Sequence, residues 1–206
     1  MKCQRLFKMK TQAFTALKFL LVMTMLMGFI YPLLMTGIAQ LCYPSKANGS
    51  LIMIDGKIRG SYLIGQKIDS NIYFWPRPSA NGYNPVPSGA SNWGPTSDTL
   101  KKLTDRRRAL FSKMNSLTDE TPIPNEMIFA SGSGLDPHIS PEAALLQVNR
   151  ISLARDFNNT MKEKLVNKIK DLTEEAQFLI LGEKRINVLR LNIELNKVEV
   201  NNKSRK

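Results

Sequence analysis

The middle of the chain reads Ser131-Gly-Ser-Gly-Leu-Asp-Pro-His-Ile-Ser140, and this run contains the only histidine of the 206 residues. Serine and glycine favour a tight turn, and Asp-Pro continues it. Ser140 followed by Pro141 is a strong helix start, because a hydroxyl N-cap precedes a proline at the first helical position. The run therefore predicts a turn that leads into a helix, and it is either an active-site loop or a structural corner.

A serine hydrolase is the obvious enzyme class for this run, because it gathers the residue types of a catalytic triad: Ser131, Ser133, Asp136 and His138. The nucleophile-elbow spacing Gly-x-Ser-x-Gly is absent, however. Triad members normally converge from distant segments, and residues of one short loop rarely reach that geometry. We therefore expect His138 to be a hydrogen-bonded corner residue. A membrane-anchored hydrolase that uses His138 stays as the alternative.

Backbone amides of the same run are a candidate anion site, since Ser131–Gly134 has the composition of a backbone nest. The run lacks the lysine of a Gly-x-x-x-x-Gly-Lys-Ser/Thr phosphate loop, so this motif does not predict direct ATP binding. A tight turn whose hydroxyls bond its own backbone is the simpler interpretation. Two cysteines and one histidine also supply too few ligands for a structural zinc site, and we expect no metal.

An apolar segment near the N-terminus predicts one membrane-spanning helix. No charged residue occurs from Phe19 to Ser45, and the strongly apolar part ends near Ile38. Its length of roughly 20 residues suits the hydrocarbon core of a bilayer. Basic residues crowd its N-terminal side, so the positive-inside bias places the N-terminus in the cytoplasm. We expect a basic cytoplasmic tail at 1–15, a transmembrane helix at 16–38 and an extracytoplasmic domain at 43–200.

Two other interpretations of the apolar segment remain open. A cleaved signal peptide is one, because Gly37-Ile38-Ala39 offers a small-x-small site, although its apolar run is normally shorter. A lipoprotein anchored at Cys42 is the other, but Leu41 is too large for the usual cleavage pattern. If the span is retained, Cys3 and Cys42 lie on opposite sides of the membrane and cannot form a disulfide.

The net charge of +12 raises the question of nucleic-acid binding. The positive charge is dispersed along the chain, and no aromatic-plus-basic recognition motif accompanies it, so we expect no nucleic-acid partner. A basic outer domain is also a poor electrostatic funnel for a cation. We therefore do not expect this domain to capture a cation.

The part after the span has the patterns of an α+β domain. A hairpin with an Asp-Gly turn is predicted at Leu51–Ile54 and Lys57–Ile64. The stretch from Tyr73 to Pro95 is dense in Pro, Gly, Asn and aromatic residues, which predicts a long ordered loop. Helices are predicted at Ser97–Met114, with Thr96 or Ser97 as the cap, in the segment that follows Ser140, and at Thr160–Leu172. Ile186–Leu195 is ambiguous between strand and helix, with helix favoured. Residues 201–206 are predicted to be a disordered tail.

Three blocks of sequence, in this order, point to one protein family. They are Tyr73-Phe-Trp-Pro-Arg-Pro-Ser-Ala80, Ser91-Asn-x-Gly-Pro-Thr96 and Ala130-Ser-Gly-Ser-Gly-Leu-Asp-Pro-His-Ile-Ser-Pro-Glu-Ala-Ala144. A single span precedes them, and a closing motif follows at Leu181-Gly-Glu-x-Arg-Ile-Asn-Val-Leu-x-Leu-Asn192. Over nearly its whole length the chain resembles the C subunit of the Kdp-type potassium-transporting ATPases.

This resemblance implies a non-catalytic subunit in the bacterial cytoplasmic membrane. Its implied partners are a channel-like potassium-binding subunit and a P-type ATPase subunit, and ATP and potassium would be handled by the complex. The family's C subunit is described as an assembly factor and as a catalytic chaperone that raises affinity for ATP. ATP is bound in the cytoplasm, where only the short tail is expected, so we expect an indirect effect. A stand-alone binding protein whose Trp75–Trp93 loop grips a ligand is a further alternative.

The resemblance also marks the residues expected to dock partners or to shape the motif blocks. They are Trp75, Arg77, Pro78, Ser79, Asn92, Gly94, Pro95, Ser131, Gly132, Ser133, Gly134, Asp136, Pro137, His138, Gln147 and Arg150. No catalytic residue is expected among them. Substitution of His138 should therefore impair assembly rather than chemistry.

Overall fold

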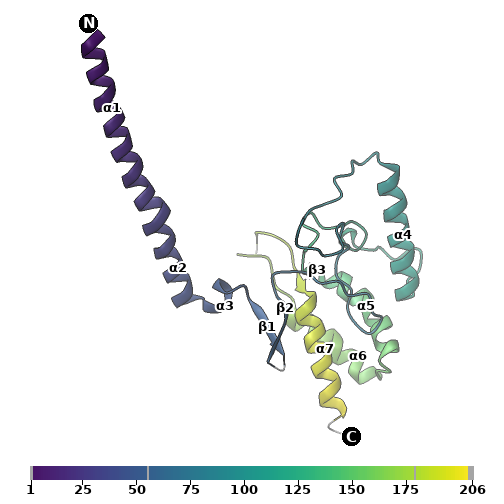
Figure 1. Cartoon of the computed structure of the whole chain (residues 1–206). Coiled ribbons are helices and arrows are strands. Elements are labelled where there is room, and N and C mark those ends of the chain that lie inside the picture. The colour runs from purple at the N-terminus through teal and green to yellow at the C-terminus, as the bar shows by residue number, and fades with distance from the viewer. Residues whose placement is uncertain (1, 55, 179, 204–206) are drawn as a thin grey trace. The chain divides into compact units, whose positions relative to one another are not determined.

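The computed structural model describes residues 2–54, 56–178 and 180–203 and consists of two compact units (Figure 1). Met1–Leu51 is the N-terminal unit, and Ile52–Lys206 is the second unit. The first is a long helix with a short connector. The second mixes helices with short strands, which confirms the predicted α+β class, and we refer to it as the α+β domain.

One helix of the N-terminal unit is long and apolar enough to cross a membrane. Lys10–Cys42 has 33 residues and a mean hydropathy of 2.0, and no other helix among the described residues is comparable. It is built from α1 (Lys2–Met23), the π-helical segment η1 (Thr24–Ile30) and α2 (Tyr31–Cys42). At 1.5 Å per residue it is roughly 50 Å long, which exceeds a hydrocarbon core of about 30 Å. The predicted span at 16–38 lies within it.

The long helix continues through Pro32 because the turn before it is wider than an α-helical turn. Proline has no N–H, and its ring clashes with the carbonyl four residues back in a regular α-helix. In η1 the hydrogen bonds reach five residues back, and the Tyr31 N–H bonds the Leu26 carbonyl in this way. The π-helical turn gives the ring room at the place where the chain lacks a donor. The proline therefore sits in the apolar segment without breaking the helix.

A folded connector follows the long helix. The short helix α3 (Pro44–Ala47) is closed by a hydrogen bond from the Ser50 N–H to the Ser45 carbonyl at 2.8 Å. The side-chain amides of Gln40 and Asn48 bond each other twice, each time at 3.2 Å. The chain between the helix and the α+β domain is therefore compact rather than extended.

The α+β domain begins with the predicted hairpin. β1 (Leu51–Ile54) pairs with β2 (Lys57–Ser61). Gly56 has φ +71°, the left-handed conformation that a tight Asp-Gly turn requires. The second strand ends three residues before the predicted Ile64, because the Ser61 hydroxyl accepts the Leu63 N–H at 3.0 Å and turns the chain.

Four helices of 14 to 18 residues form the main helical part of the described α+β domain. They are α4 (Asp98–Asn115), α5 (Pro141–Ala154), α6 (Asn159–Leu172) and α7 (Val188–Lys203). The side chains of Ser97, Ser140 and Asn158 cap the first three by accepting a backbone N–H of the first turn. The three predicted helices are confirmed, and Ser97 rather than Thr96 is the cap of α4.

A second pair of short strands joins the central run to the C-terminal segment. β3 (His138–Ile139) pairs antiparallel with β4 (Ile186–Asn187), so that His138 lies opposite Asn187. The ambiguous stretch Ile186–Leu195 therefore contains both structures, two strand residues and then helix α7. Helix α7 continues to Lys203, into the predicted tail at 201–206, whose last three residues lie outside the described part of the chain.

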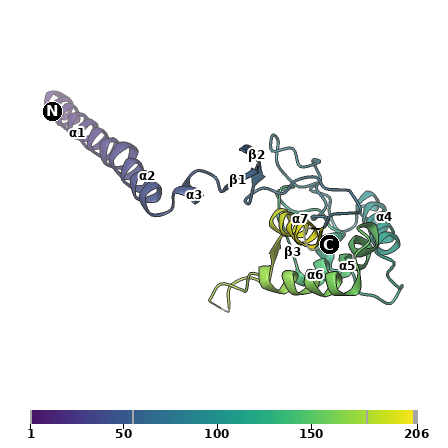
Figure 2. The same cartoon turned by 90° about the horizontal axis from the view of Figure 1, so that it is seen from below.

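The core lies where α5, α6 and α7 pack together (Figure 2). Its fully buried side chains include Ile151 of α5, Leu165 of α6 and Leu191 of α7. Helix α4 packs against α5 and adds Phe111, and the 3-10 turn η2 (Asn125–Met127) adds Met127. Phe74 of the long loop is also fully buried. The loop is thus ordered, as predicted, because part of it belongs to the core.

Candidate functional site

Two helix side chains bind the backbone of Phe74 and Trp75 as a neighbouring strand would. Gln147 of α5 accepts the Trp75 N–H at 2.7 Å through Oε1 and donates through Nε2 to the Trp75 carbonyl at 3.3 Å. Asn192 of α7 accepts the Phe74 N–H at 2.8 Å and donates to the Phe74 carbonyl at 3.0 Å. We name these two pairs the amide clamp. It satisfies backbone groups beside the core that neither small sheet reaches.

Arg150, on the next turn of α5, holds the same part of the loop. Its Nη1 donates to the Asn71 carbonyl at 2.6 Å, and its Nη2 donates to the Tyr73 carbonyl at 3.0 Å. Nη2 also donates to Gln147 Oε1 at 2.8 Å, and Nε donates to Asn115 Oδ1 of α4 at 3.0 Å. One guanidinium therefore connects the amide clamp, the loop and a second helix.

The charge of Arg150 is stabilised by dipoles and by an aromatic ring. The guanidinium carbon lies 4.3 Å from the centre of the Trp75 ring, a cation–π contact. Among the described residues no carboxylate pairs with it. Burial lowers the pKa of Arg150 to about 10, which still leaves the group charged at neutral pH. A buried arginine with this many satisfied donors serves a structural role.

Asp136 is the centre of a second polar cluster, just before β3. Its Oδ2 accepts Arg77 Nη1 at 2.7 Å, and its Oδ1 accepts the His138 backbone N–H at 3.0 Å and lies 3.5 Å from His138 Nδ1. Partial burial alone would raise the pKa of Asp136. The hydrogen bonds from His138 and Arg77, together with the Arg77 charge, outweigh burial and lower this pKa to about 2. Asp136 thus links the Trp-Pro-Arg block to the central run.

The central run also holds two distant points of the long loop. The Ser131 N–H donates to the Pro78 carbonyl at 3.1 Å, and the Gly89 N–H donates to the Ser133 carbonyl at 3.0 Å. Ser131 is buried. These backbone bonds bring the first and third sequence blocks side by side.

Gly134 allows this close approach because it has no side chain. Its φ is +71°, and a Cβ at this position would lie 2.4 Å from Asn81 Oδ1 and 3.0 Å from the Gly89 carbonyl oxygen. By contrast, a Cβ on Gly132 would meet nothing within 4 Å. Only one of the two glycines in Ser-Gly-Ser-Gly is therefore required by packing.

The serines of the central run are not arranged as nucleophiles for His138. Ser133 Oγ accepts the backbone N–H of Leu135, and Ser140 Oγ accepts that of Ala143 as the helix cap. Within the described part of the chain, neither these hydroxyls nor that of Ser131 is hydrogen-bonded to His138. The described His138–Asp136 pair therefore has no hydrogen-bonded serine from this run. The geometry therefore gives no support to the hydrolase alternative.

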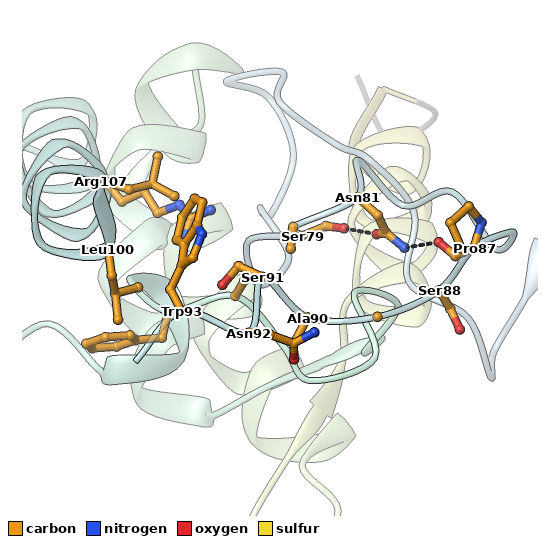
Figure 3. Close-up of a pocket in the computed structure, with 15 residues that line it drawn as sticks. Ser79, Asn81, Pro87, Ser88, Ala90, Ser91, Asn92, Trp93, Leu100 and Arg107 are labelled. Atoms are coloured by element: carbon orange, nitrogen blue, oxygen red, sulfur yellow. Dashed lines mark hydrogen bonds between the residues drawn. The ribbon is translucent and has the colours of Figure 1, made fainter. Parts of the chain in front are cut away.

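A cleft of about 690 Å³ opens between the long loop and α4 (Figure 3). All three sequence blocks reach it, together with the first turns of α4. Its lining includes Ser79, Asn81, Ser91, Asn92, Trp93, Leu100, Leu103, Arg107, Phe129 and Ala130. Figure 3 shows Trp93 with Leu100 and Arg107 along one side and Asn81 with Pro87 along the other. Trp93 and Phe129 are 42% and 41% exposed, so the cleft offers apolar surface to an incoming group.

Two residues that sequence reasoning missed shape α4 and its surroundings. Arg107 lines this cleft and also a cavity of about 390 Å³ beside Trp75, and its Nη1 donates to the Ile128 carbonyl at 3.0 Å. Burial lowers the pKa of Arg107. The Tyr83 hydroxyl donates to the Arg77 carbonyl, and burial raises the pKa of Tyr83 to about 12. Arg107 lies within α4, and Tyr83 follows the first block; neither belongs to one of the three blocks, so no motif pointed to them.

The remaining predicted residues have plainer positions. Pro137 accepts the Val188 N–H at 2.9 Å, and Gly94 accepts the Ser97 N–H at 3.0 Å just before α4. Pro95 lies in the turn between Gly94 and α4. Asn192 was not predicted as a site residue, although its position within the apolar run after Val188 is a signal for a buried polar group. Within the described residues, no three His, Cys, Asp or Glu side chains are placed to share a metal ion.

Comparisons with known proteins agree on one family. The family model described as "KdpC: K+-transporting ATPase, c chain" matches residues 13–197. The potassium-transporting ATPase KdpC subunit of Geobacter metallireducens is 46% identical over 188 residues, which cover 89% of this chain and 96% of that protein. The KdpC subunit of Leptospira interrogans is 42% identical over 182 residues, covering 88% and 91%. That of Mycobacterium tuberculosis is 41% identical over 192 residues, covering 92% and 100%.

Proposed function

The chain belongs to the KdpC family, the c chain of the K+-transporting ATPase, and from this premise we propose that it is the accessory, non-catalytic subunit of an ATP-driven potassium importer. Its partners would be a channel-like potassium-binding subunit and a P-type ATPase subunit. The chain would cross the bacterial cytoplasmic membrane once, with a cytoplasmic N-terminus and an extracytoplasmic α+β domain. Basic residues on the N-terminal side of the apolar helix support this orientation.

The observation that carries a docking role is the cleft beside α4, because all three family blocks line it. Each of the three blocks, which are far apart in the sequence, contributes lining residues to this one cleft. Trp93 provides a large, half-exposed aromatic side chain of the kind that anchors protein interfaces. We assign the cleft to an extracytoplasmic segment of the channel-like subunit.

A non-catalytic role is supported by how the polar groups of the motif blocks are used. Gln147 and Arg150 bond the loop backbone, and Asp136 bonds Arg77 and the His138 backbone. Gln147 is fully buried. Groups already engaged in the fold are not free to perform acid–base chemistry on a substrate.

The same observations support an indirect effect on ATP affinity. Neither Gln147 nor Arg150 is open to a nucleotide, and the sequence lacks a phosphate loop. We propose that the α+β domain and its helix stabilise the conformation of the partners that binds ATP better. The two sites would then be coupled through partner conformation rather than through contact.

Co-purification of the intact complex tests the docking role. Trp93→Ala should reduce the amount of this subunit that extracts with the two large subunits, because the cleft loses its aromatic anchor. Leu153→Ala is the matched control, since Leu153 is 75% exposed on α5 and does not line the cleft. Equal recovery of the two variants would rule out this cleft as the docking site.

Photo-crosslinking of the complex with an azido-ATP analogue in oriented membranes tests the indirect account. Label should appear on the ATPase subunit and be absent from the α+β domain of this chain. Specific labelling of that domain, competed by unlabelled ATP, would refute the proposal and place the nucleotide in direct contact.

A further inference from the structure

The β1–β2 hairpin exposes apolar side chains. Leu51 and Met53 flank the buried Ile52 and are 51% and 66% exposed, and Ile58 of β2 is 62% exposed. An antiparallel sheet in a soluble domain normally turns polar residues to water on its open face. Clustered apolar surface on a projecting element is instead typical of a contact site.

A second apolar projection lies between α6 and β4. Residues 173–178 and 180–185 form a segment that folds back on itself, with isolated antiparallel bridges between Glu174 and Arg185 and between Gln177 and Leu181. We name this segment the arm. At its tip Phe178 is 87% exposed and Ile180 is 83% exposed. No other part of the described domain covers these two side chains.

The hairpin and the arm project toward the same side of the α+β domain. Figures 1 and 2 show both elements on this side, with α4 on the opposite side. In Figure 2 the two projections are well separated from each other. Two separate apolar tips on one side suit a broad, flat surface better than a narrow groove.

The chain itself keeps the hairpin near the membrane. A short connector joins the end of the long helix at Cys42 to Leu51, the first residue of β1. Fully extended, this connector would span at most roughly 30 Å. This connector is folded: α3 shortens it, and the Gln40–Asn48 amide pair ties it back to the helix. The hairpin therefore begins close to the place where the apolar helix leaves the bilayer.

The basic residues of the hairpin and of its connector favour phospholipid as the flat partner. Lys57 and Arg59 are exposed on β2, before and after Ile58 in sequence and therefore on the opposite face of the strand, and Lys46 is exposed on the connector. Cationic side chains next to apolar ones are the composition of elements that bind at the surface of anionic bilayers. Their long stems can also lie along apolar surface while the charge stays in the headgroup region.

We propose that the side of the α+β domain formed by the hairpin and the arm tip rests on the headgroup region of the bilayer that holds the long helix, with anionic phospholipid as its ligand. The hairpin cannot enter the hydrocarbon core, because the outer edges of a two-stranded sheet carry unpaired backbone groups. The contact is therefore interfacial. It does not depend on the proposed function, since it requires only the membrane helix.

Depth-dependent fluorescence quenching on the full chain tests this proposal. In a background with Cys3→Ser and Cys42→Ser, single cysteines replace Met53, Ile180 or Leu153 and carry an environment-sensitive fluorophore. Each protein is reconstituted into vesicles of phosphatidylcholine and phosphatidylglycerol, with or without a nitroxide lipid whose spin label lies near the headgroup. Leu153, 75% exposed on α5, is the matched control. The nitroxide should quench positions 53 and 180 several-fold more than position 153.

Three results would overturn parts or all of the proposal. Equal quenching at the three positions would exclude the lipid contact. Protection of positions 53 and 180 from aqueous iodide, without lipid quenching, in the assembled ATPase complex would assign this side to a partner protein. Unchanged quenching in pure phosphatidylcholine, and in a Lys57→Glu/Arg59→Glu variant, would exclude the preference for anionic lipid; we expect both to weaken it.

Discussion

Gln147 binds both backbone groups of Trp75, accepting its N–H at 2.7 Å and donating to its carbonyl at 3.3 Å. The two residues are 72 positions apart, and their pairing replaces the strand that a sheet would supply. The same Oε1 atom accepts Arg150 Nη2 at 2.8 Å. One side-chain amide therefore organises the most aromatic part of the long loop.

Gln147→Leu should lower the free energy of unfolding by about 2–4 kcal/mol, because a buried N–H, a carbonyl and an arginine donor lose their partner together. Urea unfolding of the full chain in detergent micelles, followed by tryptophan fluorescence, measures the loss. Gln147→Glu is the control, since it keeps the shape and the acceptor, and its loss should be smaller. A leucine variant as stable as the wild type would contradict this account of the amide clamp.

Arg150→Lys should destabilise the domain by about 2–4 kcal/mol. A lysine ammonium has no planar fork, so it cannot bond the loop carbonyls, Gln147 and Asn115 at once. Arg108→Lys, at an exposed position of α4, should change stability by less than about 0.5 kcal/mol. The same urea titration compares them. Similar values for the two variants would show that the charge of Arg150, and not its geometry, matters.

Gly134→Ala should lower the free energy of unfolding by about 1–3 kcal/mol. The φ of +71° at Gly134 is unfavourable for alanine, and the new Cβ would lie 2.4 Å from Asn81 Oδ1. Gly132→Ala, two residues away in the same run, should stay within about 0.5 kcal/mol of the wild type, since open space surrounds it. Thermal unfolding of both variants provides the comparison. Equal losses would mean that the run matters for its composition rather than for one close approach.

The charged carboxylate of Asp136 should contribute to the free energy of unfolding, and this contribution should be lost in acid. Its pKa is about 2 in the folded protein against an ordinary value of 3.8, so the folded state binds this proton less readily than the unfolded state. The stabilisation is complete above about pH 4 and is lost as pH falls toward about 2. At neutral pH the free energy of unfolding of the wild type should exceed that of Asp136→Asn by about 1–2 kcal/mol, a value that allows for partial screening by solvent.

Urea unfolding of both proteins between about pH 2 and pH 7 checks this prediction, because other carboxylates titrate in both and cancel in the difference. The difference should shrink only at the acidic end of that range. A difference that is constant with pH would show that the Asp136 carboxylate contributes shape but not charge.

Much of the fold follows from local sequence signals. The hydroxyl caps Ser97 and Ser140 mark where α4 and α5 begin, and the Asp-Gly pair marks the first hairpin. The apolar run with basic residues before it marks the long helix. These features depend on neighbours in sequence, which is why they were predictable.

The partners of the motif residues were not predictable in the same way. Trp75, Gln147 and Arg150 were all expected to matter, but their meeting in one network depends on how α5 packs against the loop. Asn192 ends the closing motif, but it was not among the residues expected to dock partners, because the sequence alone does not show which backbone its side chain binds. The strand pair β3–β4 is only two residues long on each side, too short for a periodic signal.

The amide clamp also fixes the order in which the domain can be completed during synthesis. The backbone of Phe74 can form its hydrogen bonds only after Asn192, which is 118 positions later in the chain, has been synthesised. The backbone of Trp75 likewise requires Gln147. Contacts of such long range form late, because the intervening chain must first be closed into a loop. Until α7 has been synthesised, the aromatic residues at 73–75 lack their final partners and stay open to non-native association. The segment at 73–75 can therefore reach its final structure only after α7 has been synthesised.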